Sequence, residues 1–437
     1  MSINSKITYT LTLIFSIIFS CLFVYDKFNE ENIKWDFLTF YLSGRAADAD
    51  STLYDYRVLQ SLIDKNDSQL NKLEVPVLPY LYPPPLAYSL IPISKMSYRK
   101  ASLYWTTIGF LAFNATIYIC LLIFIEIYAN SNSNIKVNLF SYNKIEIKYF
   151  IYLILLIINF ITSFIFLFRL NISLGQVNVF VLFFISLAVF NSLKSNQMAS
   201  GLFLSLAIML KVTPIFVLIW FIAKKQYKAL YWTFISLFLI FIVSLSCGSF
   251  YNWLNFFDFL PQITHGAYAN GFNQNILNAN FSFAGILSKL LGINLLSVKV
   301  ISILLMFFLY YLMYKQISKS NNQDILFFNL SILMIITAPI AYKHHIIFLM
   351  PGSAIVLANI LTSNNKRIQL TIIVFFYLLI SLSGRYASII DISEKEILMQ
   401  YSSSIYLVLL ILLYYFINVI IKQKNELNPD FLNKEET

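Results

Sequence analysis

The stretch MASGLFLSLAIMLKVTPIFVLIWFIA, residues 198–223, decides the fold class of this chain. It contains two apolar runs, separated by Lys211 and Pro214. A lysine inside a bilayer is costly and a proline cannot continue a helix, so one straight membrane helix fits this pattern poorly. We predict two short half-helices that meet at a polar turn, because irregular backbone at membrane depth is tolerated only where protein or water covers it.

The rest of the chain has the composition of a helical membrane protein. Of its 437 residues, 59% are hydrophobic, 17% are aromatic and only 12% are charged, whereas soluble proteins carry roughly a quarter charged residues. Several apolar runs reach the ~20 residues that cross a bilayer as a helix. The first, Ile7 to Val24, follows a single lysine and lacks an A-x-A-like end, which indicates a retained helix rather than a cleaved signal peptide. The predicted fold class is therefore all-α integral membrane.

We expect one polytopic membrane domain over residues 1–437. A polar region at 25–100 forms the first loop, core helices follow at 101–247, a second loop at 248–283, further helices at 284–421 and a tail at 422–437. The spanning helices after the first loop are expected near 101–128, 149–168, 174–193, 228–247, 296–314, 325–341, 345–362, 368–384 and 403–421. The run LYPPPLAYSLIPIS (81–94) is too short to span comfortably, so we predict an interfacial segment there.

Basic residues in the short connectors predict the orientation. Lysines lie in the connectors at 131–148, 224–228, 315–320 and 364–367 and in the tail, which the positive-inside rule assigns to the cytoplasm. Counting crossings then gives about twelve helices, with both termini cytoplasmic. Every polar cluster that suggests a function falls on the opposite, extracytoplasmic face. In the alternative count, 81–97 spans, 198–223 is a single helix, and two of these clusters move inside.

Composition also excludes several classes of function. The net charge of +10 comes largely from these connectors, so it is no sign of a nucleic-acid partner. The cysteines Cys21, Cys120 and Cys247 lie in or beside apolar segments and have no metal-ligand or disulfide spacing. No phosphate-binding loop or dinucleotide fingerprint occurs, so we expect no cofactor and no metal. Any donor substrate must come from the membrane or the far side.

Asp36 is the candidate catalytic residue. It stands between Trp35 and Phe37 in EENIKWDFLTFYLSGRAADADSTLYDY, residues 30–56, just beyond the first apolar segment. We expect it in a loop among aromatic side chains. Such a setting raises the pKa of a carboxyl toward the range of a general base.

Other polar residues on the same predicted face could bind substrate. His344, His345, Lys211 and Arg169 are candidates to bind an anionic phosphate, and snorkelling or end-capping is the simpler alternative. Adjacent histidines on a helix point about 100° apart, which disfavours a shared metal. The candidates to hold sugar or acceptor are Gln176, Asn178, Tyr82, Asn273 and Gln274.

The ordered set of motifs WDFLTFY, LYPPPLAYSLIP, SLGQVNVF, LKVTP, NQN and APIAYKHH resembles glycosyltransferase family 87, over about residues 7 to 421. These enzymes have the GT-C fold and use polyprenol-phosphate sugars, and their best-described members are mannosyltransferases. The resemblance implies that Asp36 is the catalytic base and that His344 and His345 are the family's histidine pair. Asn275 departs from the family's serine, and 338–342 departs from its Ser-Pro-x-Ser-Trp.

The resemblance implies an inverting hexosyltransferase of the cell envelope. It would move mannose from a polyprenyl-phosphate donor to a glycan or glycolipid, with its site on the extracytoplasmic side of the plasma membrane. A β-linked donor would give an α-linked product. A flippase or transporter of lipid-linked sugars is the alternative from another class, since transporters also have broken helices. A polymerase or ligase of lipid-linked glycans is the third.

Overall fold

The computed structural model describes residues 33–64, 67, 69–70, 77–131, 164–263, 280–291, 295–320, 322–361 and 392–426, with Ile18 and Tyr25. Within these ranges every regular element is helical and no strand occurs. The predicted helices near 7–24 and 368–384, and most of the one near 149–168, lie outside the described residues. So do the predicted ligands Asn273 and Gln274.

The helices follow the apolar runs of the sequence. The first polar region holds α2 (Trp35–Asp48), α3 (Tyr56–Ser61), α4 (Pro84–Ser89) and α5 (Ile91–Ser94). The middle of the chain holds α6 (Tyr98–Ser131), an unlabelled helix Phe164–Leu174, α8 (Asn178–Leu193), α9 (Gln197–Leu210), η1 (Thr213–Phe216), α10 (Val217–Ala223), α11 (Tyr227–Ser246) and α12 (Phe250–Ile263). The last part holds α14 (Phe283–Leu291), α15 (Leu295–Lys319), α16 (Leu326–Ile336), η2 (Lys343–Leu349), α17 (Met350–Leu361) and α19 (Ile392–Glu426).

Within the described residues, five helices are long and apolar enough to cross a membrane: Tyr98–Tyr128, Tyr227–Ser246, Ser297–Lys319, Lys343–Leu361 and Ile405–Lys422. Shorter apolar helices, α16 among them, lie between them. Every residue of α16 is buried, so this helix is apolar on all sides and belongs to the centre of the bundle. The chain is therefore a multi-pass membrane protein, and the part of it that the structure describes is all-helical.

The chain reverses direction at Lys211, as the sequence predicts. Lys211 follows α9 in extended backbone (φ −158°, ψ 131°) and its Nζ donates to Asn178 at the start of α8. At the other end of α8, Ser192 donates to Gln226, which follows α10. Because α9 ends near the start of α8 while α10 ends near the end of α8, α9 and α10 run in opposite directions. The predicted pair of half-helices is confirmed.

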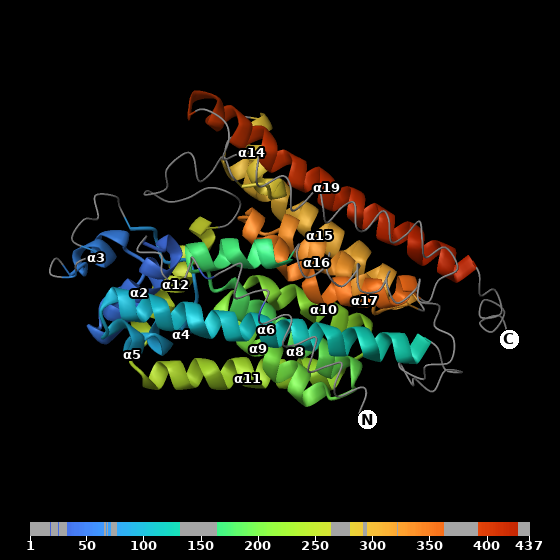
Figure 1. The fold of residues 1–437 in the computed structure, drawn as a ribbon, viewed down its shortest axis with the longest axis horizontal. Coiled ribbons are helices and arrows are strands. Elements are labelled where there is room, and N and C mark those ends of the chain that lie inside the picture. The colour runs from blue at the N-terminus through green and yellow to red at the C-terminus, as the bar shows by residue number, and fades with distance from the viewer. Residues whose placement is uncertain are drawn as a thin grey trace.

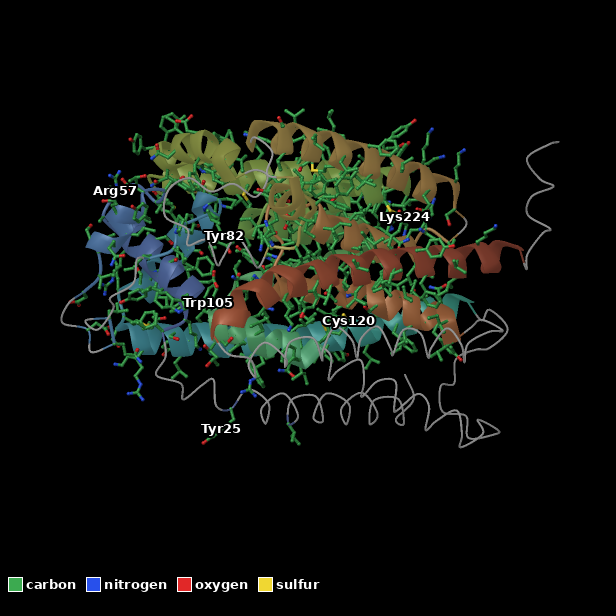
Figure 2. The ribbon with its side chains drawn as sticks, turned by 90° about the horizontal axis from the view of Figure 1, so that it is seen from above. Tyr25, Arg57, Tyr82, Trp105, Cys120 and Lys224 are labelled. Atoms are coloured by element: carbon green, nitrogen blue, oxygen red, sulfur yellow. The ribbon has the colours of Figure 1, made fainter. Side chains whose placement is uncertain are left out.

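This arrangement gives the bundle two distinct ends. Figure 1 shows α2–α5 and α12 gathered at one end, with α6, α8, α9 and α11 running away from them. Figure 2 shows the same separation in side chains, with Tyr82 near that end and Lys224 toward the other. We call the end that holds α2, Tyr82 and Lys211 the site end, and the end that holds Lys194 and Lys224 the opposite end.

Two segments expected as loops contain helices. Asp36 lies in the first turn of α2, where Phe37, Leu38, Phe40 and Tyr41 are fully buried. The sequence did not predict this helix, because it has no amphipathic pattern. Tertiary packing of its aromatic residues stabilises it instead. The segment 248–283 likewise contains α12. Helices α4 and α5 together span roughly 16 Å at 1.5 Å per residue, well short of the ~30 Å core of a bilayer.

Candidate active site

Asp36 is held at the start of α2, beside the turn that precedes α8. Its side chain is half-buried, and its carboxylate accepts a hydrogen bond from the side chain of Gln176. Loss of hydration raises the pKa of Asp36 from 3.8 to about 6, while Gln176 and the more distant Lys211 lower it in part. Such a carboxyl group is mostly ionised at neutral pH and is still basic enough to accept a proton from a hydroxyl in a transition state.

Gly175 brings Gln176 to Asp36. Its φ of +72° lies in the region that favours glycine, and a Cβ there would come within 2.4 Å of Phe37 Cβ. Trp105 of α6 donates from Nε1 to the Gly175 carbonyl oxygen at 2.9 Å and stacks on Phe37 with ring centroids 5.4 Å apart. The SLGQ turn is thereby fixed against the first turn of α2.

Lys211 lies between α8 and η2. Its Nζ donates to Asn178 Oδ1 at 2.8 Å and lies 2.6 Å from Nε2 of His345. The other ring nitrogen of His345, Nδ1, accepts from the backbone N–H of Tyr342 at 2.9 Å. Because Nδ1 accepts, the neutral imidazole has its proton on Nε2, so the contact is a hydrogen bond from Nε2–H to Lys211 in its neutral amine form. The turn after α9 and the start of η2 are joined by this contact.

A fully buried asparagine, Asn171, completes the network. Its Nδ2 donates to the carbonyl oxygens of Leu167 and His344, at 2.8 and 3.1 Å. Its Oδ1 accepts a hydrogen bond from Nδ2 of Asn178 at 3.0 Å. This bond in turn fixes the Asn178 amide with Oδ1 toward Lys211. Hydrogen bonds therefore run without a break from η2 through Asn171, Asn178 and Lys211 back to η2.

The carboxylate of Asp36 and the amine of Lys211 belong to one cluster but form no ion pair. Lys211 affects the pKa of Asp36 electrostatically, yet no contact within 4.0 Å joins them. Tyr82 lies between α2 and α9, with its ring 4.9 Å from Phe40 and 6.0 Å from Lys211 Nζ. Burial raises the pKa of Tyr82 well above its usual value, as does the charge of Asp36, so its hydroxyl remains a hydrogen-bond donor.

Two buried polar atoms of this cluster have no hydrogen-bond partner among the described residues. They are Oε1 of Gln176 and Nε2 of His344. The ring of His344 lies 4.4 Å from that of His345, so this imidazole borders the Lys211 network. Buried polar atoms of proteins are rarely left without partners, so both are suited to bind a polar ligand.

The structure brings together most of the predicted site residues. Asp36, Gln176, Tyr82, Asn178, Lys211, His344 and His345 share one cluster at the site end. Arg169 lies in the helix Phe164–Leu174 two residues before Asn171, and side chains two apart on a helix point about 200° apart. Since Asn171 faces the cluster, Arg169 faces away from it, and its role as a phosphate ligand stays a prediction. Asn273 and Gln274 also stay predictions.

Sequence reasoning missed three residues that build this site. Asn171 and Trp105 each contact a residue far away in the chain, His344 and Gly175 respectively. Lys34 is buried two residues before Asp36 and bonds Thr106 and the hydroxyl of Tyr98. A buried lysine directly before the WDF motif is a signal that could have been noticed. The partners of all three depend on tertiary packing.

Comparison with known proteins gives one family. The sequence model of glycosyltransferase family 87 matches residues 80–339, which is more than half of the chain. A search of curated proteins finds no match. The matched segment contains Tyr82, Gln176, Asn178 and Lys211, whereas Asp36, His344 and His345 lie outside its limits.

Proposed function

The chain belongs to glycosyltransferase family 87, and from that premise we propose that it transfers a hexose from a polyprenyl-phosphate donor to a hydroxyl of a glycan or glycolipid. Mannose is the first candidate for the sugar, on the precedent of the best-described members of the family. The proposal rests above all on the separation of Asp36 from Lys211 within one polar cluster. A base and an amine that do not pair with each other are both free to act on a substrate between them, the amine as a cation once it takes up a proton.

Asp36 would act as the general base. It takes the proton of the acceptor hydroxyl as that oxygen attacks the anomeric carbon, and the carbon–oxygen bond to the lipid phosphate breaks on the opposite face. One displacement inverts the anomeric centre, so a β-linked donor gives an α-linked product. The pKa of about 6 supports this role, because a base close to the working pH combines ionisation with basicity.

Lys211 would stabilise the departing phosphate. Asn178 and His345 orient its amine, and His344 Nε2 offers a further polar atom in the same cluster. Positioned donors aimed at developing negative charge are among the largest contributions to catalysis. The proposed reaction releases polyprenyl phosphate and needs no nucleotide.

The site end would face the extracytoplasmic side of the plasma membrane. The short connectors at the opposite end carry Lys194, Lys224, Lys225 and Lys319, the pattern of cytoplasmic loops. Both chain termini would be cytoplasmic, in an arrangement of about twelve membrane helices. This orientation fits a donor that is supplied within the membrane.

The proposal is tested by comparing which sugar donors the purified protein uses in detergent. We expect release of polyprenyl phosphate from polyprenyl-phosphate-mannose in the presence of a panel of lipid and glycan acceptors, and an α-linked product. Polyprenyl-phosphate-glucose tests the choice of hexose, a lipid-linked oligosaccharide tests the ligase alternative, and GDP-mannose tests the need for a lipid donor. Transfer from GDP-mannose, or binding of the lipid sugar without any product, would contradict the proposal.

A further inference from the structure

Helix α12 has two faces of opposite character at the site end of the bundle (Figure 1). One face carries Asn252, Trp253 and Phe256, which are buried. The other carries Phe250, Tyr251, Leu254 and Phe257, and these large side chains are 62%, 64%, 48% and 54% exposed. Their spacing of one, four and seven residues places them on a single side of the helix. Four exposed apolar residues on one helix face need an explanation.

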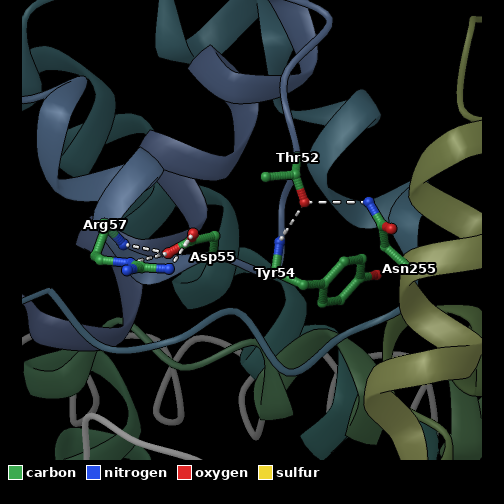
Figure 3. Close-up of polar contacts among 5 residues, drawn as sticks. All are labelled: Thr52, Tyr54, Asp55, Arg57 and Asn255. Carbon is green, nitrogen blue, oxygen red and sulfur yellow. Dashed lines mark hydrogen bonds and ion pairs between the residues drawn. The ribbon is translucent and has the colours of Figure 1, made fainter.

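The buried face fixes the segment 51–54. Asn252 accepts from the backbone N–H of Leu53 at 3.0 Å and donates to the Ser51 carbonyl oxygen at 3.2 Å. Asn255 donates to Thr52 Oγ1 at 3.1 Å, and Figure 3 shows this amide reaching across from α12 to the chain that leads into α3. The ring of Tyr54 packs against Phe256 and Phe259 of the same helix. The orientation of α12 on the protein is therefore fixed by polar bonds, and the exposed face is not an accident of loose packing.

The exposed face continues a surface that already faces lipid. Helix α11, one of the candidate membrane spans, presents Phe234, Phe238, Ile242 and Val243, which are all exposed. It ends at Ser246, and Gly248 (φ +87°) turns the chain into α12 directly afterwards. Trp253 of α12 donates to Ser244 Oγ at 2.7 Å, so the two helices are joined where the span ends. The aromatic face of α12 begins at this boundary.

We propose that α12 is an interfacial helix whose exposed face, Phe250, Tyr251, Leu254 and Phe257, inserts into the lipid leaflet at the site end. Aromatic side chains are enriched at the level of the lipid headgroups, which matches their place just past the end of α11. The helix FYNWLNFFDFLPQI contains no lysine or arginine, and its one charged residue, Asp258, is exposed at the end of this face. Insertion therefore depends on apolar area rather than on attraction to anionic lipid.

This placement would set the height of the catalytic cluster relative to the membrane. The hydroxyl of Tyr54 donates to the Tyr82 carbonyl oxygen at 2.8 Å, so α12, Tyr54 and Tyr82 form one connected support. Given the proposed function, the phosphate of the donor lies at the level of the headgroups. A helix anchored at that level holds the cluster where the reacting bond must be.

Depth-dependent quenching tests the proposal without relying on activity. In a variant in which Cys21, Cys120 and Cys247 are replaced by serine or alanine, single cysteines at positions 251 and 257 (Tyr251→Cys, Phe257→Cys) carry an environment-sensitive fluorophore. Matched controls are Phe238→Cys on the lipid-facing side of α11 and Arg57→Cys at the outer end of the molecule (Figure 2). The protein is reconstituted in phosphatidylcholine vesicles that contain lipids with a nitroxide near the headgroup or near the chain end.

Labels at 251 and 257 should lose more fluorescence with the nitroxide near the headgroup than with the nitroxide near the chain end. The label at 238 should show the reverse order, and the label at 57 should respond to neither. Addition of anionic phosphatidylglycerol should leave the values at 251 and 257 unchanged. Quenching at 251 and 257 by aqueous iodide instead of by lipid would overturn the proposal. Protection from both quenchers would show a protein partner and would overturn it as well.

Discussion

The two ends of the bundle use the same residue types in different ways. At the opposite end, Lys224 pairs directly with Asp324, and Lys194 pairs directly with Glu126. At the site end, Lys211 is bonded to an amide and an imidazole, while Asp36 is bonded to the amide of Gln176. The site end also holds the ion pairs Asp48–Lys95 and Asp55–Arg57, but its buried cluster keeps the carboxylate of Asp36 and the amine of Lys211 apart.

Charged side chains that pair with each other stabilise the fold, whereas charged or titratable side chains that are kept apart can act on a substrate. A paired lysine and carboxylate satisfy each other and present little to a substrate. A lysine held by neutral groups can take up a proton and attract an anion, and a carboxylate held by an amide keeps its basicity.

Apart from removal of the base itself, the largest effect is expected from Lys211→Met. Removal of the amine from the cluster should lower kcat by about 10²–10³, since one positioned donor to a developing anion contributes about that much. Lys224→Met is the matched change at the opposite end. It should leave kcat within about twofold and lower the free energy of unfolding by ~1 kcal/mol, because it removes a partly exposed ion pair. Equal losses of kcat in both variants would contradict the distinction between the ends.

A shift in pH dependence is expected from Gln176→Leu. The hydrogen bond from Gln176 lowers the pKa of Asp36, so its loss should raise that pKa. In the wild type kcat/KM should fall as the pH drops through about 6, because the base becomes protonated. In the variant this fall should begin at a higher pH. Gln226→Leu, which breaks the bond to Ser192 at the opposite end, should leave the acidic limb unchanged.

A smaller effect on kcat, of about tenfold, is expected from Gly175→Ala. The new Cβ would collide with Phe37, and the φ of this position disfavours alanine. The resulting shift should displace Gln176 and Asp36 and lower the free energy of unfolding by about 1–3 kcal/mol. Gly248→Ala is the matched control, because Gly248 has a similar φ but a nearest contact of 3.5 Å. Its stability should fall by about 1 kcal/mol with no change in kcat. A similar kcat in both variants would show that the SLGQ turn does not position the base.

The broad architecture could be predicted from the sequence because the signals were local. The length of the apolar runs predicted the membrane helices. Lys211 and Pro214 predicted the reversal of chain direction between α9 and α10. The clustering of distant polar motifs at one end followed from counting crossings. Helix α2 was missed because its buried residues lie on all sides, and α12 was missed because its asparagines and aromatic residues read as a loop.

Part of the candidate site lay beyond sequence reasoning because its contacts are long-range. The order of polar motifs predicted Asp36, Lys211 and His345 as site residues. No local pattern shows that Asn171 bonds the His344 carbonyl oxygen, or that Trp105 fixes Gly175. These bonds exist only once α6, the helix Phe164–Leu174 and η2 have packed, so their discovery required the structure.

The linkage between protonation and folding makes one variant especially informative. Because the pKa of Asp36 is raised in the folded protein, its contribution to stability is full below about pH 3.8 and is lost as the pH rises through about 6. Above that pH the folded state holds a poorly hydrated carboxylate. Replacing it by a neutral amide should therefore leave thermal stability at pH 8 unchanged or raised.

The most direct measurement compares Asp36→Asn with Asp48→Asn, which changes the far end of the same helix where Asp48 pairs with Lys95. Both are assayed at pH 8 for release of polyprenyl phosphate from polyprenyl-phosphate-mannose and for melting temperature. Asp36→Asn should lower the rate by about 10²–10⁴ without lowering the melting temperature, and Asp48→Asn should keep the wild-type rate. Wild-type release by Asp36→Asn would contradict the central claim that the unpaired carboxylate at the site end is the base.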